Sequence, residues 1–131
     1  MFANLLKILR RKERALSDQE HGAWGEELAS RHLASKGLKI IDRNWRNKAG
    51  ELDLVARTDE LLIFVEVKSS RHESEYLPEH RVNWKKQHKI KRLAAAYCKS
   101  HRLDQPIRYD IVSVVGEGKH IQIRHIENAF S

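Results

Sequence analysis

The chain has 131 residues, of which 40% are hydrophobic and 33% charged, and these values describe one globular domain with a heavily charged surface. Its 25 Lys and Arg residues outnumber its 18 Asp and Glu residues. The net charge of +7 favours a polyanionic partner, with nucleic acid first and an anionic membrane surface second. Cys98 is the single cysteine, which excludes an internal disulfide and a cysteine-based zinc site and fits a reducing, cytoplasmic compartment. No run reaches the roughly 18 consecutive apolar residues of a membrane span, so we expect no stable membrane insertion.

The first residues differ in composition from the rest of the chain. Residues 1–9 are mostly apolar, with Lys7 as their one charged residue, and the mostly basic run at residues 10–14 follows them, whereas a secretory signal places its basic residues first. We therefore expect a basic N-terminal appendage at residues 1–16 and a single folded domain at residues 17–131. The appendage has three alternative contacts, which are nucleic acid, lipid and the body of the protein.

A first helix is predicted by its end signals. Ser17 and Glu20 have the spacing of a capping box, and Gly37 supplies a left-handed stop. At 100° per residue, Glu26 lies beside the apolar side of this helix, whereas Glu27 points further round, toward solvent. Glu26 can therefore reach inward to acidic residues elsewhere in the fold. The alternative is that it is an ordinary acid on the flank of a helix.

Two apolar runs, at residues 50–56 and 62–68, flank a polar turn and predict a β-hairpin at the centre of the fold. A preceding strand is expected at residues 38–45, followed by a turn at residues 47–50. Charged residues interrupt both hairpin strands: Glu51 and Asp53 in the first, Glu66 and Lys68 in the second.

Strand geometry brings these charges together. A two-residue loop sets Glu51 opposite Glu66, and a four-residue loop sets Asp53 opposite Glu66. Both registers place the acids on one face, because the loop lengths differ by an even number. Carboxylates separated by about 5 Å repel one another unless a cation lies between them, and an all-oxygen ligand set suits Mg²⁺. Lys68 would lie at the rim, where an ammonium group binds a phosphate oxygen or polarises a water.

The alternative is an amphipathic hairpin whose polar face carries salt bridges to solvent. The second strand argues against it, because Ile63 and Val65 on one face and Leu62 and Phe64 on the other are all apolar. Such a strand is buried on both sides, and charged residues at its end are costly to bury without pairing or a metal.

The chain after the hairpin changes from polar to basic. Residues 69–80 predict a long loop that begins at the proposed site and is a candidate substrate-contacting flap, with disorder as the alternative. Asn83 is expected to cap a second helix that runs to about His101. Cations at the start of a helix oppose its dipole, so we interpret the basic first half as a phosphate-binding surface; solvated charge is the alternative. Two further strands are expected at residues 106–115 and 120–125.

This order of elements, with acids on a helix and two strands, resembles the PD-(D/E)xK nuclease fold of restriction enzymes and archaeal Holliday-junction resolvases. More closely, the chain resembles the YraN family of uncharacterised bacterial proteins. The resemblance covers roughly residues 17–116 and is carried by residues 22–29, 44–46, 50–55, 64–68, 86–87 and 108–112. It implies an α/β, restriction-endonuclease-like three-layer core, α-β-β-β-α-β, with a central mixed sheet flanked by helices.

The nuclease pattern also implies roles for single residues. Asp53 and Glu66 would bind Mg²⁺ or Mn²⁺, helped by the carbonyl of Val67. Lys68 would position or activate the attacking water, and Glu26 would hold a metal-bound water or a second ion. The candidate nucleic-acid-binding residues are the cations and the amide around this site: Arg46, Arg71, Lys85, Lys86, Gln87 and Lys89.

The main functional hypothesis is a Mg²⁺-dependent nuclease acting on DNA, in branched or single-stranded form. The alternative is a nucleic-acid-binding protein on a nuclease-like scaffold without catalysis. The related resolvases act as dimers, so the resemblance also implies a homodimer as one candidate assembly.

Overall fold

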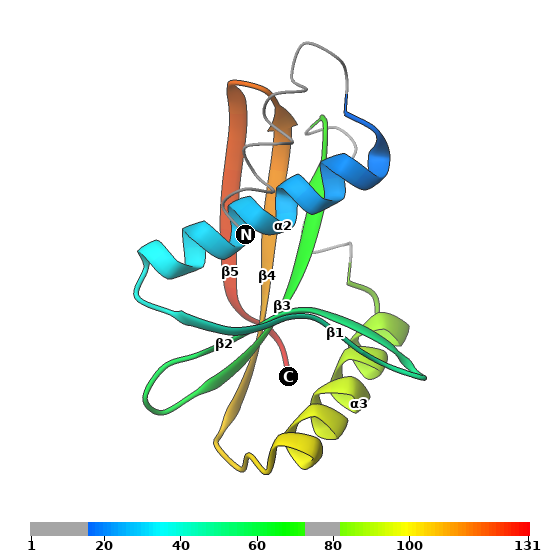
Figure 1. The fold of residues 1–131 in the computed structure, drawn as a ribbon, viewed down its shortest axis with the longest axis vertical. Helices are drawn as coiled ribbons and strands as arrows, with labels where there is room; N and C mark the ends of the chain where they lie inside the picture. Colours follow the sequence, from blue (N-terminus) through cyan, green and yellow to red (C-terminus); the bar gives the residue numbers. More distant parts are fainter. Residues whose placement is uncertain (1–15, 73–81) are drawn as a thin grey trace.

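The computed structural model describes residues 16–72 and 82–131, which form an α/β fold in the order α-β-β-β-α-β-β (Figure 1). Its elements are α2 (Asp18–Ser35), β1 (Lys39–Asn47), β2 (Gly50–Arg57), β3 (Leu62–Ser70), α3 (Trp84–His101), β4 (Ile107–Glu117) and β5 (His120–Phe130). Residues 1–15 of the expected appendage and residues 73–80 of the expected flap lie outside the described residues. Neither of the helices in the described part is long and apolar enough to cross a membrane.

The five strands form one mixed sheet in the order β1-β2-β3-β4-β5. β3 and β4 pair in parallel, and every other neighbouring pair is antiparallel. Parallel neighbours need a long crossover connection, and α3 lies within the one that joins β3 to β4. The predicted mixed sheet with flanking helices is therefore confirmed.

The central hairpin adopts the longer of the two loops considered. Arg57 pairs with Leu62, so the turn spans residues 58–61 and its register sets Asp53 toward Glu66. The hydroxyl of Thr58 accepts hydrogen bonds from two backbone amides of this turn, which satisfies donors that the sheet leaves unpaired.

Each face of the sheet is covered by one helix. The core on the α2 side consists of Trp24, Ala29, Leu33, Leu54, Ala56, Ile63, Val65, Val112 and Val114. The core on the α3 side consists of Leu52, Val55, Leu62, Phe64, Val82, Ile90, Leu93, Ala94, Tyr97 and Ile111. Residues 54–56 of β2 and residues 62–65 of β3 alternate between these cores, so β3 is buried on both faces as predicted. Burial of one large apolar side chain contributes about 1.5–3 kcal/mol, which fixes both helices to the sheet.

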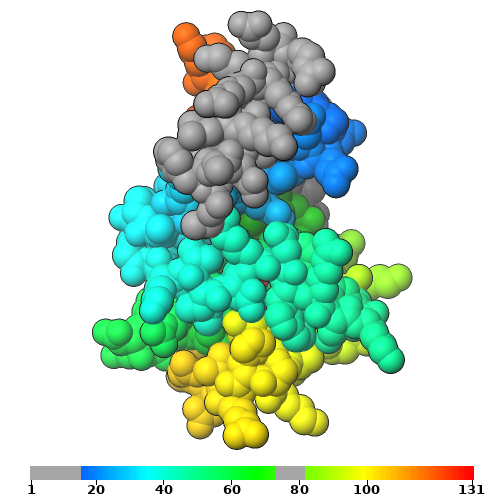
Figure 2. All heavy atoms as spheres, viewed as in Figure 1, coloured from blue at the N-terminus to red at the C-terminus, as the bar shows by residue number. Residues whose placement is uncertain are grey.

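The C-terminal end of α3 packs beneath β1. The ring of Trp45 lies 5.3 Å from that of Tyr97 and 6.4 Å from that of His101. In the space-filling view, the end of α3 (yellow) lies directly below the side chains of β1 (Figure 2). This contact fixes β1, the strand at one edge of the sheet, to α3.

Two element boundaries predicted from the sequence are wrong. Ser69 and Ser70 belong to β3 and not to a loop, because they continue the parallel pairing with β4. β5 extends to Phe130, five residues beyond the predicted end. Its polar end is held by buried Asp110, which accepts hydrogen bonds from His125 and from the backbone of Asn128. A polar run with such partners pairs as a strand despite its lack of apolar alternation.

Candidate metal centre

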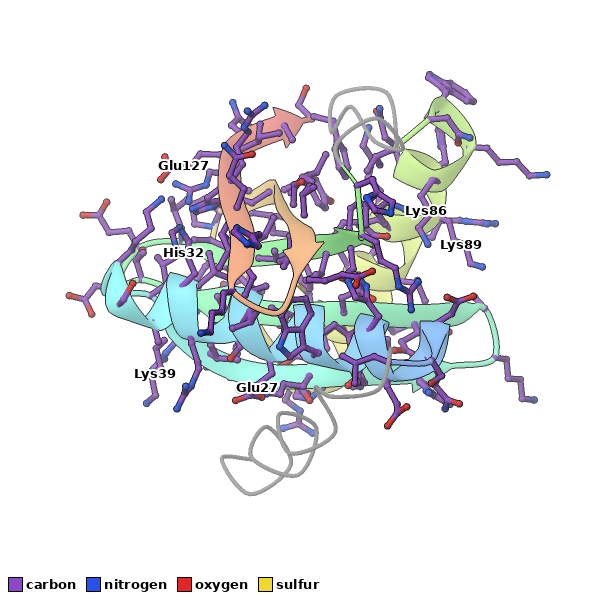
Figure 3. The ribbon with its side chains drawn as sticks, turned by 90° about the horizontal axis from the view of Figure 1, so that it is seen from above. Glu27, His32, Lys39, Lys86, Lys89 and Glu127 are labelled. Atoms are coloured by element: carbon purple, nitrogen blue, oxygen red, sulfur yellow. The ribbon has the colours of Figure 1, made fainter. Side chains whose placement is uncertain are left out.

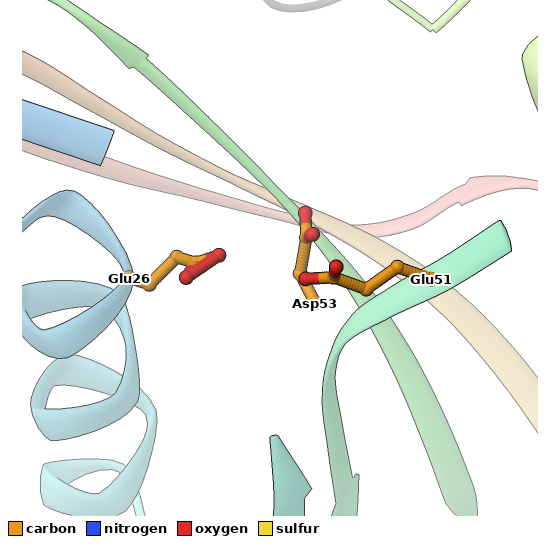
Figure 4. A group of neighbouring side chains, drawn as sticks. All are labelled: Glu26, Glu51 and Asp53. Atoms are coloured by element: carbon orange, nitrogen blue, oxygen red, sulfur yellow. The ribbon is translucent and has the colours of Figure 1, made fainter. Parts of the chain in front are cut away.

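Three carboxylates converge where α2 faces the start of β2. They belong to Glu26, Glu51 and Asp53, and one oxygen of each lies within 4.8 Å of the other two. The carboxylate of Glu26 extends from α2 toward the two strand residues (Figure 4). Among the described residues this is the group of His, Cys, Asp or Glu side chains close enough to share one metal ion, and we call it the acidic cluster.

The position of α2 depends on its start and on one glycine. Ser17 and Glu20 form the predicted capping box, with the two side chain–backbone hydrogen bonds at 3.1 and 3.2 Å. A Cβ atom at Gly25 would come within 1.9 Å of the Ser69 hydroxyl oxygen, so a glycine is needed for this close approach of α2 to β3. The next residue, Glu26, is thereby brought to the acidic cluster.

Asn44 of β1 links two members of the cluster. Its amide nitrogen lies 2.7 Å from a Glu51 oxygen and 3.2 and 3.3 Å from the two Glu26 oxygens. Its φ of 49° is left-handed, a conformation that Asn adopts more readily than most residues. The second Glu51 oxygen pairs with Arg46 Nε at 2.8 Å. One hydrogen-bond donor therefore orients two acids toward the same point.

Asp53 lies where β2 and β3 stop pairing. The ladder runs from Arg57 back to Leu54, and beyond it one Asp53 oxygen accepts a hydrogen bond from the backbone N–H of Val67 at 2.8 Å. Burial, and next the charge of Glu66, raise the pKa of Asp53 to about 8, while the Val67 N–H acts in the opposite direction. The protein therefore holds a carboxyl group that resists ionisation unless additional positive charge is supplied.

Two lysines converge on one oxygen of Glu66. Lys68 Nζ lies 3.4 Å from Glu66 Oε1, and Lys86 Nζ lies 3.6 Å from the same atom. Lys86 reaches this oxygen from the start of α3, beside β3 (Figure 3). Glu66 is 7% exposed, so its charge is compensated by these two ammonium groups rather than by bulk water.

The acidic cluster fits a hard divalent cation. Its donors are all carboxylate oxygens, which is the ligand type that Mg²⁺ and Mn²⁺ take. Burial raises the pKa of Glu26, and the charges of Glu51 and Glu66 raise it further, although the Asn44 hydrogen bond acts against them. The ionised forms of Glu26 and Asp53 are therefore both disfavoured, and a bound cation would relieve this by supplying positive charge.

The structure brings most of the predicted site residues to one place. Glu26 and Asp53 are in the acidic cluster, and Glu66 and Lys68 lie beside it, since the charge of Glu66 acts on Asp53. Val67 contributes its backbone N–H to Asp53.

The predicted nucleic-acid contacts are more dispersed. Arg71 binds Asp18 at 2.7 Å, Glu117 at 3.2 Å and the Leu16 carbonyl at 2.6 Å, so it ties the start of α2 to the end of β4. Gln87 donates a hydrogen bond to the Val82 carbonyl at 2.9 Å. Lys85 is exposed, and Lys89 is half-buried, with its side chain against Gly50.

One predicted orientation is wrong. Glu27 does not point to solvent; it is 8% exposed, and its carboxylate accepts a hydrogen bond from the Arg43 guanidinium, which also donates to Ser30. The prediction took the inner face of the helix from its apolar residues alone. It could not include Arg43, because this cation comes from β1 and packs against α2 only in the folded chain.

Two residues of the site received no catalytic or metal-binding role from the nuclease resemblance. The sequence placed Glu51 on one strand face with Asp53, and the structure has it in the acidic cluster. The contacts of Asn44 could not be predicted from the sequence pattern, because they depend on its left-handed backbone.

Comparison with known proteins identifies the family of the chain. The model of "Uncharacterised protein family UPF0102" matches residues 25–114, which is more than half of the chain. The chain belongs to the UPF0102 family. The YraN-like family predicted from the sequence is therefore confirmed.

Several UPF0102 proteins are similar over most of their length. The relative from Rhodococcus opacus is 42% identical over 111 residues, covering 83% of this chain and 94% of the relative. The relative from Syntrophotalea carbinolica is 44% identical and covers 83% and 89%. The relative from Clostridioides difficile is 40% identical over 116 residues and covers 88% and 100%. The matched UPF0102 region includes the acidic cluster and both lysines at Glu66.

Proposed function

We propose that this UPF0102 protein is a metal-dependent nuclease that hydrolyses phosphodiester bonds in nucleic acid, with DNA in branched or single-stranded form as the substrate. The observation that carries the proposal is the acidic cluster of Glu26, Glu51 and Asp53, placed beside a carboxylate that holds two lysines. Metal-assisted phosphodiester hydrolysis uses a Lewis acid and gains from further cations near the phosphate, and this site offers ligands for the first and side chains for the second.

The acidic cluster would hold a Mg²⁺ or Mn²⁺ ion, with Glu66 at its edge. When bound, such an ion stabilises negative charge on the transferring phosphate and lowers the pKa of a bound water. Asn44 keeps Glu26 and Glu51 oriented toward the ion, because its amide contacts both carboxylates.

The two lysines have a separate task. Each ammonium lies within 4 Å of Glu66 Oε1, so a phosphate oxygen entering beside Glu66 would meet two cations, one from β3 and one from α3. Lys68 orients the attacking water, and Lys86 neutralises charge on the phosphate. A contact between a lysine ammonium and a phosphate oxygen is charge-assisted and therefore stronger than a neutral hydrogen bond.

The charge distribution supports nucleic acid as the substrate. α3 carries six Lys and Arg residues and no acidic residue along its length. The chain as a whole has a net charge of +7. A helix that carries basic residues and no acidic ones attracts the negatively charged phosphates of a nucleic-acid backbone.

The direct test is hydrolysis by the purified full-length protein with Mg²⁺ or Mn²⁺ on branched, single-stranded and duplex DNA. We expect cleavage that stops when EDTA removes the metal. We expect Asp53→Asn, Glu66→Gln and Lys68→Met each to lower the rate by at least about a hundredfold, since loss of a residue that only hydrogen-bonds to a metal ligand already costs 10- to 100-fold.

A matched control is Glu60→Gln, which removes one exposed carboxylate in the turn between β2 and β3. It should leave the rate unchanged. Cleavage that persists in Asp53→Asn would contradict the proposal, because the activity would then come from a contaminant or another site. DNA binding with no cleavage by the wild-type protein would instead support a non-catalytic binding protein on this scaffold.

A further inference from the structure

The outer face of α3 carries a tryptophan that the protein core does not use. Trp84 is 73% exposed, whereas Trp24 is 2% exposed and Trp45 is half-buried against Tyr97. An aromatic side chain of this size contributes most when buried, and the largely exposed ring of Trp84 leaves that area open to a partner. Its ring lies 3.9 Å from that of His88, one helical turn further on, which holds it in place.

The surroundings of Trp84 are positively charged. At 100° per residue, Trp84, Lys85, His88 and Arg92 fall within an arc of about 100°, and all four are exposed. We call these four residues the outer face of α3. Among the described residues, none forms an ion pair with Lys85 or Arg92. An aromatic surface among unpaired cations suits a ligand that has both flat bases and a negatively charged backbone.

A cationic path connects this face to the metal centre. Lys85, Lys89 and Lys86 lie at about 100°, 140° and 200° from Trp84 around the helix, and Lys86 contacts Glu66. The backbone N–H groups in the first turn of α3 add a partial positive charge to the same region. A phosphate backbone bound at Glu66 can therefore follow these three lysines around the start of α3 to reach the outer face.

We propose that the outer face of α3 binds unpaired bases of single-stranded nucleic acid by stacking them on Trp84, while Lys85, Lys89 and Lys86 follow the backbone into the metal centre. This inference rests on the proposed function and specifies its substrate, a strand with unstacked bases. Duplex DNA keeps its bases paired and stacked inside, so it cannot offer a base face to Trp84.

The test measures binding by the full-length protein in EDTA, so that hydrolysis plays no part. The probes are a short oligothymidylate, an abasic strand with the same backbone, and a duplex of equal length. We expect the wild-type protein to bind the oligothymidylate more tightly than the abasic strand. Trp84→Ala should weaken oligothymidylate binding by roughly 5- to 150-fold, the range for loss of one base–aromatic stack, and should leave abasic binding unchanged.

Two further variants separate stacking from general effects. Trp84→Phe keeps an aromatic face and should retain most of the affinity, while Ile121→Ala, at an exposed apolar residue of β5, should have no effect. In the wild type, oligothymidylate should also quench tryptophan fluorescence, and Trp84→Phe should remove that quenching.

Three results would overturn the inference. The first is equal oligothymidylate affinity for the wild type and Trp84→Ala. The second is an equal loss of affinity for the abasic strand, which would mean that Trp84 acts through the folding or packing of α3 and not through a base. The third is a change of oligomeric state in Trp84→Ala with nucleic-acid affinity intact, which would place Trp84 in a protein contact. Failure of the nuclease proposal appears separately, as absent cleavage with this binding intact.

Discussion

Asp53 is a half-buried carboxyl group whose pKa is raised to about 8, chiefly by burial and next by the charge of Glu66. An unfolded aspartate ionises near pH 3.8, so between about pH 4 and pH 8 the folded protein holds a proton that the unfolded chain has lost. Its metal-free stability therefore falls as the pH rises through this window.

We predict that Asp53→Asn stabilises the metal-free protein, because the amide cannot ionise. The gain in the free energy of unfolding should be smallest near pH 4 and should reach about 1–2 kcal/mol at pH 8, a size usual for relief of a strained functional site. Urea unfolding of both proteins at the two pH values measures it. A gain independent of pH, or a loss at pH 8, would show that Asp53 is not the group whose ionisation opposes folding.

Lys86 is the second residue with a testable electrostatic role. We predict that Lys86→Met tightens Mn²⁺ binding, measured by calorimetry, and lowers the cleavage rate at the same time. A divalent ion that displaces one proton still adds net positive charge, so removal of a neighbouring ammonium favours it, whereas the phosphate loses a contact. Lys119→Met, at an exposed cation in the turn between β4 and β5, is the control. Parallel loss of metal affinity and cleavage in Lys86→Met would contradict this role.

At the scale of elements, the position of α2 on β3 decides whether Glu26 reaches the metal centre. Gly22 and Gly25 lie three residues apart on α2, yet a Cβ at Gly22 meets no atom within 4 Å, whereas one at Gly25 meets the Ser69 side chain at 1.9 and 3.0 Å. We predict that Gly22→Ala raises the free energy of unfolding by about 0.5–1 kcal/mol through helix propensity, and that Gly25→Ala lowers it by about 1–3 kcal/mol through overpacking.

Thermal or urea unfolding of the two variants provides the comparison. Ser69→Ala should restore part of the loss in Gly25→Ala, because it removes the nearer of the two contacting atoms. A stabilising effect of Gly25→Ala would mean that α2 does not depend on this contact.

Helix ends and the alternation of strand residues could be predicted from the sequence. The capping box, the Asn83 cap and the apolar alternation of β3 depend on neighbours within a few residues, and each is present as predicted. The orientation of Glu27 and the contacts of Asn44 could not be predicted. The first depends on Arg43 of another element, and the second depend on a left-handed backbone. Local patterns predicted where acids share a face, whereas contacts between α2 and β1 needed the folded chain.

At the scale of the whole molecule, the excess of positive charge should govern nucleic-acid affinity. We predict that replacement of Lys85, Lys86 and Lys89 by Gln weakens DNA binding and flattens its dependence on salt. Each lost phosphate contact should reduce the slope of log K against log salt by about 0.7 for a single strand. Binding titrations in EDTA at several salt concentrations measure the slope, and Lys119→Gln, an exposed cation in the turn between β4 and β5, is the control. An unchanged slope would remove α3 from the binding surface.

The central claim is that the side chains of Glu26, Glu51 and Asp53 hold one divalent cation beside Glu66. The most direct measurement is anomalous diffraction at the manganese edge from crystals of the full-length protein soaked in Mn²⁺ above pH 8, where Asp53 ionises most readily. We expect a single strong peak among the oxygens of these three carboxylates. A peak elsewhere, or none at this position when Mn²⁺ is visible at other sites, would contradict it.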